Sequence, residues 1–143
     1  MSAGYRTVHL DEIPTVRFAG EPIPDWKPVR RELGISAFGT NAYVADAAGD
    51  VVVEPHDEQP KDGESDRGHQ EIYLVLDGAA RFTVDGEQVD VPKGGIVFIE
   101  DPSLHREAVA LEPRTVVFAV GGPAGEVFVP SEWEEDFLKR GTS

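Results

Sequence analysis

The stretch EIYLVLDG at residues 71–78, followed by FTVDG at 82–86, decides the fold of this chain. All five residues from Ile72 to Leu76 are apolar, and most are β-branched, aromatic or leucine. Asp77-Gly78 and Asp85-Gly86 follow these apolar runs directly, and an Asp-Gly pair is a strong signal for a tight hairpin turn. The stretch therefore predicts consecutive antiparallel strands joined by short turns.

The same pattern of short apolar runs continues in both directions. The 15 Gly and 11 Pro residues stand between these runs, as expected for many short strands rather than helices. The predicted strands are 30–38, 41–46, 50–56, 71–76, 80–84, 88–91, 95–99, 105–111 and 114–120. A chain of 143 residues fits one domain, and this strand profile predicts an all-β sandwich, barrel or jelly roll.

The two ends of the chain differ from its middle. Four prolines exclude a helix interior from residues 1–28, which we expect to form an irregular N-terminal arm. Residues 29–122 are the predicted barrel, and residues 123–143 are a C-terminal extension. Ser131 and Glu134 form a capping box, and Lys139 and Arg140 precede Gly141, so this extension is expected to contain a short helix.

Three predicted strands, at 71–76, 95–99 and 114–120, are apolar at nearly every position instead of at alternate ones. Such strands are covered on both faces, whereas a monomeric barrel covers only the inner one. The outer face then needs the arm, with Phe18, Ile23 and Trp26, or a second copy of the chain. Because large apolar patches are uncommon on monomers, we expect a homodimer.

Charge and composition exclude several classes of partner. The 27 acidic residues outnumber the 13 basic ones and give a formal charge of −14, which disfavours binding of nucleic acid. No run approaches the ~18 apolar residues of a membrane span. The chain has no cysteine, so thiolate chemistry is excluded and a reducing cytoplasm is the expected location.

Two motifs in this sequence resemble those of the cupin family. Glu71 and Gly78 are separated by six residues, as in the first cupin motif, and Gly94 and His105 by ten, as in the second. The resemblance covers about residues 35–120. It implies a double-stranded β-helix, the jelly-roll barrel of that family.

The first motif also contains a His-x-His pair before its Glu. Ser65 and Arg67 stand at that spacing here, and neither is a good metal ligand. His56-Asp57-Glu58 is an alternative counterpart, displaced by an insertion at 59–68, with Glu58 in place of the second histidine. Glu58 in a solvated acidic loop is the competing interpretation.

The candidate metal ligands are His56, His69, Glu71 and His105. His69 and Glu71 are two residues apart and so share a strand face, and His105 has the position of the ligand in the second motif. Imidazole and carboxylate together suit iron, manganese, nickel or zinc. An exposed His69 and a hydrogen-bonded His105 at the barrel rim remain alternatives, whereas Glu71 on a buried strand needs a partner.

The resemblance implies a small organic ligand in the barrel and, for an enzyme, a metal-dependent oxygenase or isomerase. The alternative is a metal-free module that binds or senses a small molecule, which the missing His-x-His pair favours. The sequence has no nucleophile elbow and no glycine-rich phosphate loop, so acyl transfer and nucleotide hydrolysis have no support.

Overall fold

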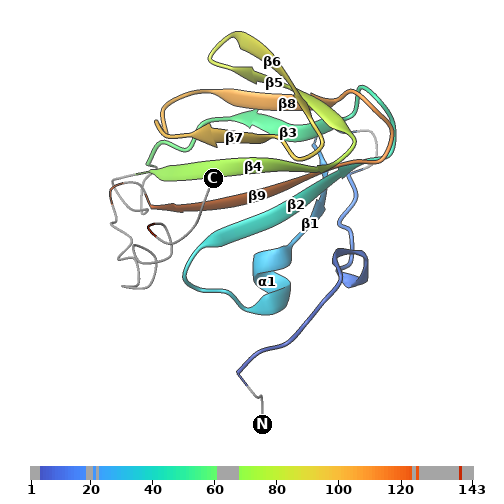
Figure 1. The fold of residues 1–143 in the computed structure, drawn as a ribbon, viewed down its shortest axis with the longest axis vertical. Coiled ribbons are helices and arrows are strands. Elements are labelled where there is room, and N and C mark those ends of the chain that lie inside the picture. The colour runs from blue at the N-terminus through green and yellow to red at the C-terminus, as the bar shows by residue number, and fades with distance from the viewer. Residues whose placement is uncertain are drawn as a thin grey trace.

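Two antiparallel sheets face each other in this computed structural model, which describes residues 4–18, 21, 23–60, 68–123, 125 and 139. Their arrangement can be followed in Figure 1. The five-stranded sheet has the order β1 (Asp25–Lys27), β2 (Gly39–Ala45), β9 (Thr115–Pro123), β4 (His69–Asp77) and β7 (Ile96–Ile99). The four-stranded sheet has the order β3 (Val51–His56), β8 (Arg106–Ala110), β5 (Ala79–Val84) and β6 (Glu87–Pro92).

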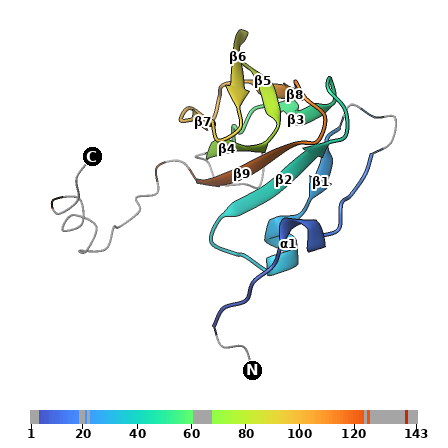
Figure 2. The ribbon, with the colours of Figure 1, turned by 45° about the vertical axis from the view of Figure 1, so that its right-hand side comes forward.

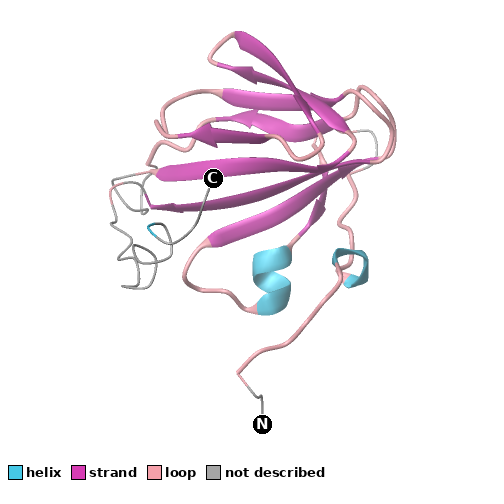
Figure 3. Ribbon diagram, in the orientation of Figure 1, coloured by secondary structure: helices cyan, strands magenta, loops and turns pink. Residues whose placement is uncertain are grey.

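The chain passes repeatedly from one sheet to the other, as in a jelly roll. β4 belongs to one sheet and β5 to the other, and β8 and β9 are divided in the same way. Strands dominate the described residues, and the helical elements are short (Figure 3). The predicted all-β class with antiparallel strands is thus confirmed.

The hairpin predicted at Asp85-Gly86 is present between β5 and β6. Val84 pairs with Glu87, so the loop has two residues. Asp85 has φ 50° and Gly86 has φ 88°, and two successive positive φ angles are those of a type I′ turn, whose twist matches that of the flanking strands.

The main core lies between the two sheets. Its buried residues include Tyr73 and Val75 of β4, Phe82 of β5, Ala108 of β8 and Val117 of β9. The rings of Tyr73 and Phe82 are tilted, with centroids 5.6 Å apart. Tyr73 and Val75 therefore line the barrel interior.

The strand predicted at 30–38 is wrong, because its first part forms the helix α1 (Val29–Leu33). Arg, Glu and Leu are good helix formers, and Gly34, at φ 70°, ends the helix in the left-handed conformation. The N–H of Ile35 donates to the carbonyl of Arg30 at 3.0 Å, which completes a Schellman motif. Only β2, from Gly39, follows as a strand.

α1 and the 3-10 helix η1 (Leu10–Glu12) lie against the outer face of the five-stranded sheet, away from the second sheet (Figure 2). There Ile13, Val29 and Ala42 form a second small buried cluster, with Phe118 packed against it. The N-terminal segment thus covers the β2–β9 half of the outer face. The β4–β7 half keeps exposed apolar side chains, at Ile72, Leu76, Ile96 and Phe98.

Residues 25–27, within the predicted arm, form the edge strand β1 beside β2. The predicted C-terminal helix, apart from Lys139, lies outside the described residues. In the part of the chain that the structure describes, no helix is long and apolar enough to cross a membrane.

Candidate functional site

The two sheets bring three potential metal ligands together at one end of the barrel. His56 ends β3, Glu71 lies near the start of β4, and Glu58 follows β3 by two residues. One ligand atom from each of these side chains lies within 4.8 Å of the others. His56 and Glu71 are therefore brought together as predicted, and Glu58 joins them.

A bulge in β3 turns His56 toward the barrel interior. Val53 pairs with Ala108, and His56 pairs with Arg106, so three steps along β3 match two along β8. In a regular strand, residues an odd number apart face opposite sides. The extra residue at the bulge restores the inward direction, and His56 lies directly opposite Arg106.

Backbone hydrogen bonds fix Glu58 at the same place. Its N–H donates to the carbonyl of Pro102 at 2.9 Å, and its own carbonyl accepts from the N–H of His69 at 3.1 Å. Its carboxylate Oε1 lies 2.9 Å from His56 Nε2. The i, i+2 spacing of His56 and Glu58 carried this signal, although the residues around Glu58 favoured a solvated loop.

Glu71 has three partners, all at the same oxygen. The hydroxyl of Tyr73 donates to Oε1, Arg106 Nη1 lies 3.1 Å from it and His56 Nε2 lies 3.8 Å from it. Gly121 is opposite Glu71 in β9, and a Cβ there would lie only 2.7 Å from Glu71 Cγ. Gly121 thus leaves the room that the Glu71 side chain occupies.

Arg106 belongs to this site, although a lone arginine on a strand is usually solvated. Its side chain is 0% exposed and also donates to the carbonyls of Pro102 and Leu104. Arg106 lies on the same face of β8 as the buried residues Ala108 and Ala110. Small residues on the inner face of the same strand were the available signal, because they leave space for a long side chain.

His105 does not reach this cluster. It precedes Arg106 by one residue and is exposed, since neighbouring residues of a strand face opposite sides and Arg106 takes the inner one. The second motif thus assigns its ligand to His105, whereas the residue that faces the barrel interior is the next one, Arg106. His69 lies at the edge, half exposed, with Nδ1 3.6 Å from Glu58 Oε2.

The carboxylates stabilise a proton on His56. Interaction with Glu58 and then Glu71 raises the pKa of His56 from 6.5 to about 10 despite its burial. Burial alone raises the pKa of Glu71, but His56, Tyr73 and Arg106 together hold it below its ordinary value. Without a metal, two carboxylates thus face two cations, and the cluster is balanced in charge.

The donor set fits a divalent ion such as iron, manganese, nickel or zinc. His56 Nδ1 lies 2.5 Å from the carbonyl of Glu54, a contact that orients the ring and directs Nε2 at the carboxylates. The contacts of Glu71 described above all use Oε1. A cavity of about 180 Å³ adjoins the cluster and is lined by Gly39, Thr40, Asn41, Tyr43, Glu58, His69, Glu71, Ala119 and Gly121.

No family model matches this sequence, and no curated protein matches it significantly. Solved structures do match its fold. A cupin protein from Bacteroides fragilis has 18% identity and a TM-score of 0.64, over 91% of this chain and 93% of that one.

Two further structures with this fold carry enzyme names. A sugar phosphate isomerase of the cupin superfamily from Silicibacter pomeroyi has 15% identity and a TM-score of 0.63, over 83% of this chain and 76% of its own. A predicted oxalate decarboxylase from Thermotoga maritima has 17% identity and a TM-score of 0.61, over 82% of this chain and 99% of its own. At these identities the likeness concerns the fold alone: this chain has the same fold as these cupin structures.

Proposed function

We propose that this chain, which has the cupin fold, binds a divalent metal ion through His56, Glu58 and Glu71 and takes a small organic ligand in the adjoining cavity. The convergence of one imidazole and two carboxylates within 4.8 Å carries the proposal. Glu71 comes from the other sheet, so local chain geometry does not explain its meeting with His56 and Glu58. His69, which lines the cavity, is a candidate additional contact.

A bound metal would supply Lewis acidity or oxygen activation. In that case the chain acts as a metal-dependent isomerase or oxygenase of the cytoplasm. The isomerase name of a structural neighbour supports this choice at the level of the fold only. The Tyr43 hydroxyl lies in the same cavity, and burial and nearby carboxylates raise its pKa further above neutral pH, to about 12. It is therefore protonated and can donate a hydrogen bond to a ligand.

Metal analysis tests this proposal. Protein purified without added metal, and the same protein after addition of ferrous iron, manganese, nickel or zinc, is assayed for bound metal by mass spectrometry and for its melting temperature. We expect about one ion per chain and a higher melting temperature, because a ligand that binds only the folded state stabilises it. His56→Ala and Glu71→Gln should both lose the ion.

His105→Ala is the matched control, since His105 is exposed and should leave metal content unchanged. If the wild-type protein takes up no ion and no metal changes its melting temperature, the metal site does not exist. Loss of the ion from His105→Ala but not from His56→Ala would also refute the proposed ligand set.

The second candidate is a metal-free binding module, and the Arg106–Glu71 pair favours it. A buried guanidinium already supplies a positive charge 3.1 Å from the Glu71 carboxylate. In this case the cluster is a polar wall of the ligand cavity instead of a metal centre. Failure of every metal above, with retained binding of a small molecule, would select this candidate.

A further inference from the structure

A second cavity shares two lining residues, Tyr43 and Asn41, with the first. Its volume is about 270 Å³, and its other lining residues are Phe18, Ile23, Pro24, Trp26 and Glu54. The volume of this second cavity approaches roughly 300 Å³, the lower end of the range for small-molecule sites. We call the second cavity the aromatic chamber.

The N-terminal segment and β1 hold the chamber wall in place. Trp26 lies opposite Tyr43 in the β1–β2 register, so both side chains stand on the same face of the sheet. The N–H of Trp26 donates to the carbonyl of Val16 at 2.9 Å, and the carbonyl of Trp26 accepts from the N–H of Val16 at 2.7 Å. The N–H of Phe18 donates to Asp25 Oδ1 at 3.3 Å. The chamber is therefore a built feature of this chain, with two anchored aromatic residues.

Carboxylates line both cavities. Glu58 and Glu71 line the first cavity, where they face the cations His56 and Arg106. Glu54 lines the chamber, so it is the acidic group that the chamber itself offers to a cation. Aromatic faces add cation–π attraction.

We propose that the aromatic chamber binds an aromatic amine, with its ring beside Phe18 and Trp26 and its ammonium group near Tyr43 and Glu54. This assignment rests on the proposed function, of which it specifies the ligand class. The aromatic side chains receive the apolar part of such a molecule, and Glu54 receives its charge. An aromatic acid of the same size meets the negative charge of Glu54 and is disfavoured.

Three probes with one ring and different head groups test the assignment: benzylamine, benzyl alcohol and benzoate. Each is titrated into chelator-treated protein by calorimetry and by change in melting temperature. Benzylamine should bind about tenfold more tightly than benzoate, a difference of about 1.4 kcal/mol, with benzyl alcohol between them. Binding of benzoate as tight as that of benzylamine, or no binding of benzylamine, overturns the proposal.

Variants locate the probe. Phe18→Ala should weaken benzylamine binding about tenfold through loss of the ring contact, whereas Tyr5→Ala, which removes an aromatic ring that is 77% exposed, should not. Glu54→Gln should weaken binding of benzylamine but not of benzyl alcohol. If Phe18→Ala unfolds the chain, Ile23→Ala replaces it, with the exposed Val89→Ala as its control. Equal affinities in chamber and control variants place the probe elsewhere and refute the assignment.

Metal addition separates this inference from the proposed function. Metal uptake without benzylamine binding refutes the aromatic chamber as an amine site and leaves the metal site intact. Benzylamine binding that depends on Phe18, in protein that takes up no metal, confirms the chamber and refutes the metal site.

Discussion

At the scale of single residues, Arg106 determines the electrostatics of the barrel end. Its guanidinium is fully buried and bonds to Glu71 and to two backbone carbonyls. A buried charge is tolerated when it is paired and hydrogen-bonded. The same contacts hold Glu71 in place, so this arginine positions a candidate ligand without being one.

Arg106→Met should lower the free energy of unfolding by about 3–5 kcal/mol, the usual cost of removing one partner from a buried ion pair. It also leaves the carbonyl of Leu104 without its Arg106 donor, whereas the carbonyl of Pro102 keeps the N–H of Glu58. Urea denaturation measures the loss. The double variant Arg106→Met, Glu71→Gln should recover part of it, because no unpaired carboxylate remains. A loss no larger than that of Arg81→Met, at an exposed ion pair, would contradict this role.

The proton on His56 predicts how stability depends on pH in the metal-free protein. The pKa of His56 is raised from 6.5 to about 10 in the folded state by Glu58 and Glu71. A raised pKa stabilises the folded state in full below pH 6.5, and this stabilisation is lost as pH rises through about 10. The melting temperature of wild type minus that of His56→Gln should therefore fall from pH 6.5 to pH 10. A difference that stays constant over this range, in the presence of a chelator, would show that Glu58 and Glu71 do not stabilise a proton on His56.

At the scale of elements, a glycine in β9, Gly121, leaves space for the Glu71 side chain of β4. Gly121 and Glu71 are paired across the two strands, and a Cβ at Gly121 would also lie 2.9 Å from the carbonyl of Gln70. The backbone carbonyl cannot move without disturbing the ladder, so the carboxylate would have to shift.

Gly121→Ala should therefore lower both the melting temperature and any metal content. Gly122→Ala is a closely matched control, because a Cβ at the adjacent position meets nothing within 4 Å. Circular dichroism during heating and metal analysis of both variants give the comparison. Equal behaviour of the two variants would mean that the space beside Glu71 has no role.

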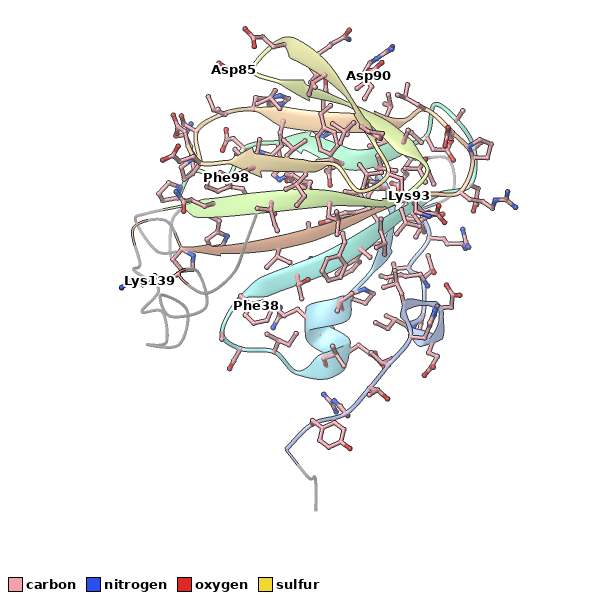
Figure 4. The ribbon with its side chains drawn as sticks, in the orientation of Figure 1. Phe38, Asp85, Asp90, Lys93, Phe98 and Lys139 are labelled. Carbon is pink, nitrogen blue, oxygen red and sulfur yellow. The ribbon has the colours of Figure 1, made fainter. Side chains whose placement is uncertain are left out.

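At the scale of the whole molecule, the N-terminal segment covers only half of the outer face of the five-stranded sheet. Ile72 pairs directly with Phe98, and the exposed Ile96 and Leu76 continue the apolar surface along β7 and β4. Phe98 and Phe38 both lie toward the left edge of the molecule in Figure 4. A contiguous apolar surface of this kind favours association of two copies through this face.

The protein should therefore be a homodimer, with twice the chain mass of 15.6 kDa in light scattering. Phe98→Glu should shift it toward the monomer, because a charge in the centre of an apolar interface must be desolvated without a partner. Val89→Glu, at an exposed apolar residue on the other sheet, should leave the mass unchanged. A monomeric wild-type protein at micromolar concentration would contradict the homodimer.

Local features of the sequence determined most of the β architecture. The apolar runs from 41 to 120 and the Asp-Gly turns predicted eight of the strands, because strand period and turn conformation depend on neighbouring residues. The helix at 29–33 was missed, since its short helix-forming run resembles the start of a strand. Glu71 and His56 were identified from their residue types and motif spacing.

Only the tertiary structure decided which polar side chains meet. The bulge that turns His56 inward, the inward direction of Arg106 instead of His105, and the backbone contacts that hold Glu58 all depend on pairing between segments far apart in the chain. A shift of one residue in register reverses the face on which every side chain of a strand lies. Spacing within one strand cannot fix that register, so the sequence could name the candidate residues but not the set that converges.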